Sequence, residues 1–519
     1  MFDFLASLYA PFFMASVLSL VGWMLAQRRE QLARIFQKVL MLSLGAYVVS
    51  VFSANAQFDD KLGVLFRDLL VMGATGFAFR MLMAKRVALV VGGVALAAGY
   101  LWFYQTQLKT TFKPEMISQN AYELDANGEL LIEIKEQASL DRLNGSLAKY
   151  DLQVERAFHP AAADQTNLDN YYVVDIPNDK VHQLQNIEEA LYKSGIITWV
   201  EENEVVNVAP MPAKKLPPIN NKFGINDPGL EQMWGFEAMH VDKLYSFLND
   251  NNIKPRRRAL IAILDTGVDE KHEDLKGNFK SLGGKHNSDP VGHGTHCAGI
   301  AGAVSNNGKG VASYSTDNRF VRIASIRVLN SFGSGTQRGI IQGMIEAADK
   351  GADVLSMSLG GVSDRFKRKA YTDAVQYVTK AGGIVVAAAG NSSKNAKNYA
   401  PVNTPGVIGA SAIDQDLNKA HFSNTVQDIK MGVAAPGVGI YSTIPNNKYG
   451  AYNGTSMATP YVAGLVGLLK SLNPDLTAEQ AYQILHKTGK NTKAGKETGK
   501  LIQPADAVKA LVGKSKVLQ

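Results

Sequence analysis

The stretch YGAYNGTSMATPYVAGLVGLLKSL, residues 449–472, places a crowd of small residues directly before an apolar run. Four residues of that run recur at helical spacing and predict a buried helix: Val462, Leu465, Val466 and Leu469. Ser456 stands at or just before the start of this helix, where a serine is ordinarily an N-cap. Gly454 lets the backbone approach another group closely, Ala458 adds little bulk, and Pro460 suits an early helical position. This setting presents Ser456 to something outside the helix, which suits a nucleophile if a base lies elsewhere in the chain.

Four apolar runs occupy the first hundred or so residues of this 519-residue chain, at about 5–26, 39–56, 69–83 and 87–104. A helix needs about 17 to 25 apolar residues to span a bilayer. The first and last runs approach or reach that length, and the middle two lie at or below its lower limit. Little polar sequence separates the runs, which argues against buried core helices. The first run is followed by Arg28 and Arg29 rather than by a small-residue cleavage site. We therefore predict an all-α transmembrane segment of four helices over residues 1–105.

Basic residues between the runs predict the orientation of this segment. They lie between the first and second runs and between the third and fourth: Arg28, Arg29, Arg34, Lys38, Lys85 and Arg86. The remaining connection, SANAQFDDKLG, is acidic. By the positive-inside rule both basic loops are cytoplasmic, so the N-terminus and everything after residue 104 lie on the outer side. Arg80 falls in the third run near its cytoplasmic end, where we expect it to reach the interface rather than act as a buried functional charge.

The net charge of +7 raises the question of a nucleic-acid partner. Part of the excess is the topological charge just described, and Arg256, Arg257 and Arg258 precede a strand as a solvated edge. The sequence contains no basic stripe with interleaved aromatic residues, so we predict no nucleic-acid partner. The single cysteine, Cys297, excludes an intrachain disulfide and with it a disulfide-stapled secreted scaffold.

Residues 119–209 alternate between strand and helix patterns. The stretches LLIEIK, LQVERAF, YYVVDI and IITWVEE predict strands, and SLDRLNGSLAKY and DKVHQLQNIEEALYKS predict helices. Their order, βαββαβ, is that of a small α+β ferredoxin-like domain. The following linker, residues 210–225, is rich in proline and lysine, which indicates an exposed segment that a protease can cut.

From residue 226 to the end, continuous apolar strands alternate with helical patterns. ALIAILDTG, FVRIASIRVL, ADVLSMSLGG and GIVVAAAGN predict strands, and GTQRGIIQGMIEAADKG is one of the helices between them. This alternation is typical of an α/β fold with a parallel sheet covered on both faces. Functional groups gather beyond the carboxyl ends of such strands, and these ends carry Asp265, Ser358 and Asn391.

Four side chains together offer the parts of an acyl-transfer site. Asp265 closes an apolar strand, where an aspartate is often only a turn residue or cap. His293 has a glycine on each side in HGTHCAGIAG, which leaves its ring room to face a substrate, whereas a lone histidine is more often structural. Asn391 follows a glycine, from which its amide can donate into a cleft. With Ser456 these residues supply an orienting carboxylate, a base, an oxyanion donor and a nucleophile.

The motifs resemble those of the subtilisin-like serine proteases. DTGVDEKHEDL, HGTHCAGIAG and NGTSMATPYVAG resemble the three catalytic motifs of that family in its chain order, and SMSLGG and AAAGN resemble its substrate-binding and oxyanion segments. The resemblance covers about residues 226–510 and implies a subtilisin-like three-layer fold with a mainly parallel sheet. It implies that Ser456 attacks the scissile carbonyl, that His293 transfers the proton and that Asp265 holds the imidazole tautomer. Asn391, assisted by Thr455 and the Ser456 backbone N–H, would bind the oxyanion.

The resemblance also assigns substrate contacts and raises the question of a metal. The residues it places along the substrate backbone and the primary side-chain pocket are Ser334, Gly335, Ser358, Leu359, Gly360, Ala388, Ala389 and Gly390. No cofactor is required for catalysis. Asp274 matches a ligand position of the family's calcium site, but the stretch IAGAVSNNGKGVAS looks shorter than the family's calcium loop, so calcium binding stays open. Cys297 resembles the cysteine of the family's thiol-bearing branch, and a small buried residue is the alternative interpretation.

The same resemblance gives the upstream domain a role. Residues 119–209 resemble the family's inhibitor-type prodomain, so the domain at 226–519 is expected to be the peptidase and to cut its own linker between about 207 and 222. We predict a membrane-anchored serine endopeptidase with both domains on the extracytoplasmic side, which is the periplasmic side if the membrane is a bacterial inner membrane. Its partners would be a peptide or protein substrate, its own prodomain and the lipid bilayer. The alternatives are a membrane sensor or transport module with a regulated or inert protease-like domain, and a secreted protease with a long leader.

Overall fold

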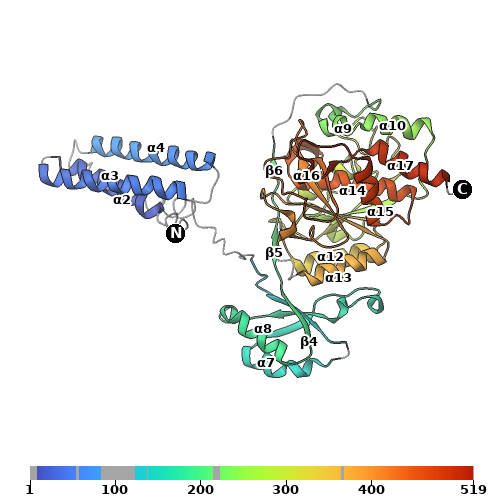
Figure 1. Cartoon of the computed structure of the whole chain (residues 1–519), viewed down its shortest axis with the longest axis horizontal. Helices are drawn as coiled ribbons and strands as arrows, with labels where there is room; N and C mark the ends of the chain where they lie inside the picture. The colour runs from blue at the N-terminus through green and yellow to red at the C-terminus, as the bar shows by residue number, and fades with distance from the viewer. Residues whose placement is uncertain are drawn as a thin grey trace. The chain divides into compact units, whose positions relative to one another are not determined.

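The computed structural model describes residues 9–27, 29–53, 58–82, 123–136, 138–213, 223–363 and 368–517. They belong to two compact units, one within residues 1–121 and one within residues 122–519. The described part of the first unit is helical. The second unit contains a small antiparallel sheet and a large parallel sheet, both drawn in Figure 1.

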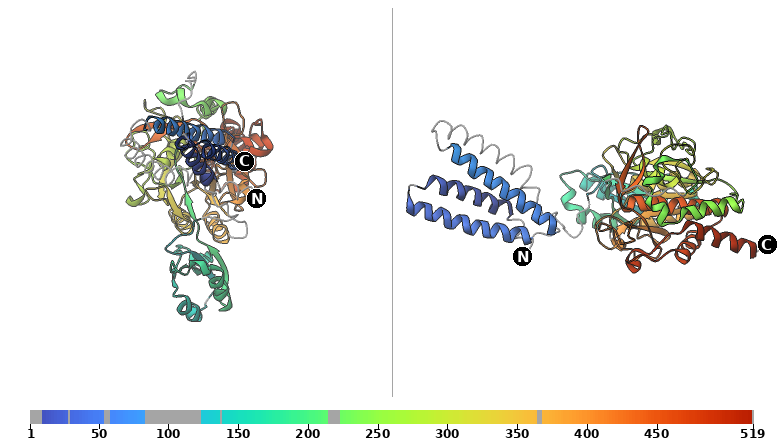
Figure 2. Two further views of the ribbon diagram at one scale, coloured as in Figure 1. Left: turned by 90° about the vertical axis from the view of Figure 1, so that its left-hand side faces the viewer. Right: turned by 90° about the horizontal axis from the view of Figure 1, so that it is seen from above.

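Three helices make up the described part of the first unit: α2 (Tyr9–Leu25), α3 (Glu30–Ser53) and α4 (Phe58–Leu82). They lie side by side, as the right-hand view of Figure 2 shows. Among the described residues one helix, Glu30–Phe52, is long and apolar enough to cross a membrane, and a shorter apolar helix spans Pro11–Leu25. The fourth predicted run, 87–104, lies outside the described residues. The prediction of four membrane helices is therefore not confirmed.

A buried polar network joins the three helices. Its residues in α4 precede the predicted third apolar run, because α4 begins at Phe58 rather than near residue 69. The Asp68 carboxylate is fully buried, and it accepts hydrogen bonds from the Tyr47 hydroxyl at 3.0 Å and from Arg67 Nε at 2.8 Å. The Tyr9 hydroxyl of α2 donates to the same carboxylate. The predicted third run began one residue after Asp68, so it left this charged pair out. Arg80 is exposed in the last turn of α4.

The small sheet of the second unit has the element order that the sequence predicts. Its strands are β1 (Leu130–Ile134), β2 (Gln153–Arg156), β3 (Tyr171–Asp175) and β4 (Ile197–Glu202), paired antiparallel in the order β2-β3-β1-β4. Helix α7 (Asn144–Tyr150) lies between β1 and β2 in the chain, and α8 (Leu184–Lys193) lies between β3 and β4. Because side chains alternate across a strand, Leu130 and Ile132 pack with the helices, whereas Leu131 joins a core shared with the large sheet.

The large sheet has seven strands, all parallel, in the order β18-β15-β14-β12-β10-β7-β8. Their bounds are β7 (Ala259–Asp265), β8 (Val321–Arg327), β10 (Val354–Met357), β12 (Ile384–Ala388), β14 (Val407–Ile413), β15 (Gly432–Pro436) and β18 (Lys500–Leu501). The four predicted strands coincide with β7, β8, β10 and β12. The prediction of a mainly parallel α/β sheet is confirmed.

Helices cover both faces of this sheet. On one face α11 (His293–Gly302), α14 (Thr455–Leu472) and α17 (Pro504–Val517) pack against residues such as Ile261 and Ile263 of β7. On the other face α12 (Gln337–Asp349) and α13 (Lys369–Lys380) pack against Leu260, Ala262 and Leu264. The further helices are α9 (Trp234–Ala238), α10 (Val241–Asp250), α15 (Ala478–Thr488) and α16 (Gly495–Thr498).

Several short strands form small sheets of their own outside the large sheet. They are β5 (Val205–Asn207), β6 (Met211–Pro212), β9 (Ser334–Thr336), β11 (Gly361–Val362), β13 (Tyr399–Ala400), β16 (Ile440–Ile444) and β17 (Lys448–Asn453). β5 pairs with β9, and β6 pairs with β17. The carboxyl ends of β7, β10 and β12 and the first turn of α14 meet beside these strands, and this arrangement positions the site.

Candidate active site

A hydrogen-bonded carboxylate and imidazole form the centre of the site. Asp265 is the last residue of β7, and His293 is the first residue of α11. His293 Nδ1 lies 2.8 and 2.9 Å from the two carboxylate oxygens of Asp265, and both side chains are buried. Burial opposes a charged imidazole, but the Asp265 carboxylate outweighs it, and the pKa of His293 is raised above its ordinary value. Because Nδ1 is held by the carboxylate, Nε2 is the nitrogen left to exchange a proton.

Asp289 forms hydrogen bonds to residues next to both Asp265 and His293. It is buried, and its carboxylate accepts hydrogen bonds from the N–H groups of Gly292 and Thr295, both at 2.8 Å. It also accepts from the hydroxyls of Thr295 at 2.7 Å and Thr266 at 2.8 Å. Thr266 directly follows Asp265, while Thr295 lies in the first turn of α11. A carboxylate at a helix N-terminus satisfies its unpaired N–H groups, so Asp289 fixes the start of α11 relative to the end of β7.

Ser456 is the second residue of α14, whose N-cap is Gly454 at φ 148°. The serine side chain is not a cap, because its hydroxyl donates to the backbone carbonyl of Ser358 at 3.2 Å. The prediction that Ser456 opens a buried helix and faces outside it is therefore confirmed, and the N-cap alternative is excluded. Ser456 is buried, with 8% of the residue exposed.

The carbonyl of Ser456 has an unusual set of partners. Pro460 stands four residues later, where a helical N–H would normally bind this oxygen, and proline has none. The Ser358 hydroxyl donates to the Ser456 oxygen at 2.7 Å, and the Cys297 thiol donates at 3.4 Å. Burial raises the pKa of the Cys297 thiol well above its ordinary value, so the thiol keeps its proton. Ser358 and Cys297 thus replace the missing helical hydrogen bond beneath the serine.

Asn391 follows β12, and its amide is oriented by Thr455. The side-chain oxygen of Asn391 accepts hydrogen bonds from the N–H and the hydroxyl of Thr455, both at 2.9 Å. The amide NH2 group is therefore the part left to donate to a ligand. The Thr455 hydroxyl spends its single proton on Asn391, and its oxygen accepts from the Gly390 N–H at 3.1 Å. Thr455 thus orients the Asn391 amide, and its assistance in binding an oxyanion stays a prediction.

The predicted substrate-contact residues lie on three segments around these groups. Ser334 and Gly335 belong to β9; Ser358, Leu359 and Gly360 follow β10; Ala388 ends β12, and Ala389 and Gly390 follow it. The first of these segments, β9, already pairs with β5 of the same chain. In β5, Val206 stands opposite Gly335, and Asn207 stands opposite Ser334.

Asp274 does not present the surroundings of a calcium ligand. Its carboxylate is fully buried, and it accepts hydrogen bonds from Asn307 Nδ2 and from the Val311 N–H, both at 2.8 Å. The Asn307 amide cannot be turned round without loss, because its oxygen accepts from the Lys309 N–H at 2.8 Å. Burial raises the pKa of Asp274 to about 7 in spite of these donors. Calcium needs several oxygen ligands, whereas the groups that hydrogen-bond to this carboxylate are N–H donors; the nearby carboxylates of Asp227 and Glu273 act on it only by raising its pKa further.

The fold and the site define a serine endopeptidase, and the chain belongs to the subtilase family. The model of the subtilase family matches residues 256–502. Thermitase of Thermoactinomyces vulgaris is 46% identical over 220 residues, which are 41% of this chain and 75% of thermitase. Subtilisin DY of Bacillus licheniformis is 42% identical over 238 residues, 44% of this chain and 83% of that protein. A thermophilic serine proteinase of Bacillus sp. strain AK1 is 33% identical over 350 residues, 66% of this chain and 78% of that protein.

Sequence reasoning missed Asp289 and the support beneath Ser456. Asp289 stands four residues before His293 in an Asp-Pro turn, so its position ahead of a helix was the available signal. The sequence predicts Pro460 at an early helical position, and in the structure it is the sixth residue of α14. The spacing of four residues between Ser456 and Pro460 is therefore the sequence signal that the Ser456 carbonyl lacks a helical N–H donor.

Proposed function

We propose that this subtilase is a membrane-anchored extracytoplasmic endopeptidase that is held by its own prodomain, with Ser456 as the nucleophile. The observation that carries the catalytic part is the buried Asp265 and His293 pair, joined at 2.8 Å. Helix α11, which begins with His293, contacts the start of α14 through Cys297, whose thiol lies 3.4 Å from the Ser456 carbonyl oxygen. Asn391, with its amide oxygen held by Thr455, supplies the oxyanion donor.

In the proposed mechanism each of these groups has a defined role. The Ser456 hydroxyl gives its proton to Nε2 of His293 as its oxygen attacks the scissile carbonyl carbon. The charged imidazole is stabilised by Asp265, which stays ionised. Asn391 and the Ser456 N–H donate to the developing oxyanion. His293 then returns the proton to the leaving amine, and water hydrolyses the acyl-enzyme with the same groups in reverse.

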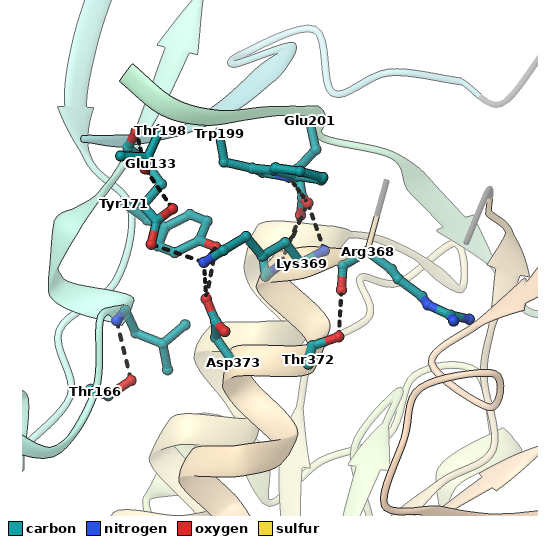
Figure 3. Close-up of polar contacts among 12 residues, drawn as sticks. Glu133, Thr166, Tyr171, Thr198, Trp199, Glu201, Arg368, Lys369, Thr372 and Asp373 are labelled. Carbon is teal, nitrogen blue, oxygen red and sulfur yellow. Dashed lines mark hydrogen bonds and ion pairs between the residues drawn. The ribbon is translucent and has the colours of Figure 1, made fainter. Parts of the chain in front are cut away.

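The small βαββαβ domain, a ferredoxin-like fold in this proposal, would be the inhibitor-type prodomain. Its contacts with α12 and α13 support this role, and those with α13 are drawn in Figure 3. The Glu201 carboxylate accepts from the Lys369 N–H at 2.9 Å at the start of α13, and Asn203 Oδ1 accepts from the Arg338 N–H at 3.0 Å at the start of α12. Two polar side chains of the small domain thus cap two helices of the peptidase domain.

An ion-pair network strengthens the same contact. Lys369 Nζ donates to Glu133 of β1 at 2.9 Å and to Asp373 of α13 at 2.8 Å, and Trp199 Nε1 donates to Glu201 at 2.8 Å (Figure 3). The match with the Bacillus sp. strain AK1 proteinase gives further support, because its 350 residues exceed the length of residues 226–519. Part of that match must lie upstream of residue 226.

The membrane anchor rests on the apolar helices of the first unit, with Glu30–Phe52 as the best candidate span. We infer a multi-pass segment in a bacterial inner membrane, with residues 119–519 on the periplasmic side. The test is fractionation of cells that express the chain with an N-terminal tag. Tagged fragments that resist carbonate extraction support the anchor, whereas a soluble tagged fragment contradicts it.

Self-processing is tested by comparing the wild type with Ser456→Ala through intact mass and N-terminal sequencing. We expect a new N-terminus between about residues 207 and 226 in the wild type and a full-length chain in the variant. Identical cutting of both chains would contradict self-processing.

A further inference from the structure

We propose that the peptide bond held opposite Ser456 is Ala209–Pro210, and that Pro210 slows the enzyme's cut of its own chain. This inference rests on the proposed roles of Ser456 and of residues 119–209. It adds which bond is presented, and it names a residue that sets the rate of maturation.

The chain before this bond is fixed by pairing with the peptidase domain. β5 runs antiparallel to β9, and the Val208 N–H continues the ladder by donating to the Gly333 carbonyl at 2.8 Å. The Val206 side chain is 3% exposed, and a Cβ on Gly361 of β11 would lie 3.3 Å from its Cγ2 atom. Residues 205–208 are therefore bound as an added strand, with one apolar side chain buried.

The chain after the bond is fixed by a second pairing. Met211 stands opposite Asn453, and the Ala213 N–H donates to the Ala451 carbonyl at 2.8 Å. A Cβ on Gly454, the N-cap of α14, would lie 3.4 Å from the methyl carbon of Met211. Residues 211–213 therefore lie along β17, the strand that leads directly into Ser456.

Only Ala209 and Pro210 connect these two paired segments. One pairing ends at Val208 beside β9, and the other begins at Met211. Met211 stands opposite Asn453, which lies two residues before the helix that carries Ser456. The central bond of this crossing is Ala209–Pro210. The chain thus runs from one pairing to the other beside the helix that carries the nucleophile, and it is bound on both sides of this bond as a substrate would be.

Cutting this bond has a difficulty that bonds before residues other than proline do not share. Ser456 Oγ would bond to the Ala209 carbonyl carbon, the bond from that carbon to the Pro210 nitrogen would break, and His293 would pass the serine proton to that nitrogen. The proline nitrogen carries a ring carbon where other residues carry a small hydrogen. The ring also restricts the residue before it and fixes its own φ. With both neighbours held in ladders, the crowded nitrogen cannot turn easily towards His293.

The test follows processing of the full chain in membranes by intact mass over time, for the wild type and Pro210→Ala. Pro212→Ala is the matched control, because it removes a proline from the same segment two residues from the bond. We expect Pro210→Ala to speed the appearance of a fragment that ends at Ala209 by about tenfold or more, and Pro212→Ala to change the rate by less than about twofold. Thermal unfolding of each variant in the Ser456→Ala background shows whether the substitution affects folding.

Three results would overturn the inference. They are an unchanged rate in Pro210→Ala, an equal acceleration in Pro212→Ala, and a cut at a different bond of the segment in Pro210→Ala. The Ser456→Ala chain separates this inference from the proposed function. If that chain is cut like the wild type, self-processing fails, whereas an uncut Ser456→Ala chain with no effect of Pro210→Ala refutes the role of Pro210 alone.

Discussion

Replacing Ser358 by alanine should weaken the support of the Ser456 backbone. The substitution leaves the side chains of Asp265, His293, Asn391 and Ser456 unchanged. The Ser358 hydroxyl donates to the Ser456 carbonyl at 2.7 Å, and Pro460 prevents the helix from supplying a donor of its own. After the substitution the buried carbonyl keeps only the Cys297 thiol at 3.4 Å, which is a weak donor.

The expected cost follows from that lost bond. A buried polar group that loses its partner costs about 1–3 kcal/mol, so the free energy of unfolding should fall by this amount. The first turn of α14 carries Ser456, and a displacement of a catalytic group by about 1 Å can cost about 100-fold in rate. We therefore expect kcat to fall by about tenfold or more, with a smaller change in KM.

Ser356 provides the matched control, because it lies in β10 two residues before Ser358 and is equally buried, but its hydroxyl has no hydrogen-bond partner among the described residues. Ser356→Ala should leave the free energy of unfolding within about 0.5 kcal/mol of the parent or raise it. Stability is measured by urea titration in the Ser456→Ala background, which prevents self-digestion, and kcat is measured with an active Ser456. Equal effects of the two substitutions on stability and kcat would refute the reasoning.

Three further predictions concern pH and calcium. The raised pKa of His293 means that kcat/KM increases with pH through a midpoint above the ordinary histidine value. In Asp265→Asn the residual activity should increase with pH through a lower midpoint than in the wild type. Burial raises the pKa of Glu201 to about 7, so the docked small domain is most stable at low pH and loses stability as the pH rises through about 7. Calorimetry of the cut domain should show a dissociation constant that rises between about pH 5 and pH 8, and Glu201→Gln should remove this dependence. Because N–H donors face Asp274, a calcium chelator should leave the thermal midpoint of the peptidase domain unchanged, and a clear fall would contradict the account.

Much of the fold could be predicted because strand patterns in this chain are unambiguous. β7, β10 and β12 are largely apolar runs that end at or just before a small or polar residue, and the parallel arrangement brings their carboxyl ends to one edge. Asp265 and Asn391 could be placed at that edge from the sequence alone. The helical unit was harder, since a count of apolar residues cannot show that Asp68 is buried among tyrosines and an arginine.

The support of the site depends on contacts that no local pattern contains. Ser358 and Cys297 meet the Ser456 carbonyl from segments 98 and 159 residues away in the chain. The richness of the linker in proline and lysine predicts exposure, and Pro212 is exposed, but the composition does not predict that residues 211 and 212 form a strand against β17. A proline in an edge strand is tolerated where its missing N–H faces away from the ladder, and the composition gives no sign of this.

The central claim, that Ser456 is the activated nucleophile of a working peptidase, is tested most directly by labelling with a serine-directed fluorophosphonate. The account predicts one phosphonate on Ser456 in the processed wild type, located by peptide mass mapping, and none in Ser456→Ala. The residual labelling rate of His293→Ala should be far below that of the wild type. A processed, folded wild-type protein that fails to label at Ser456 would contradict the account and favour the alternative of an inert protease-like domain carried by a membrane module.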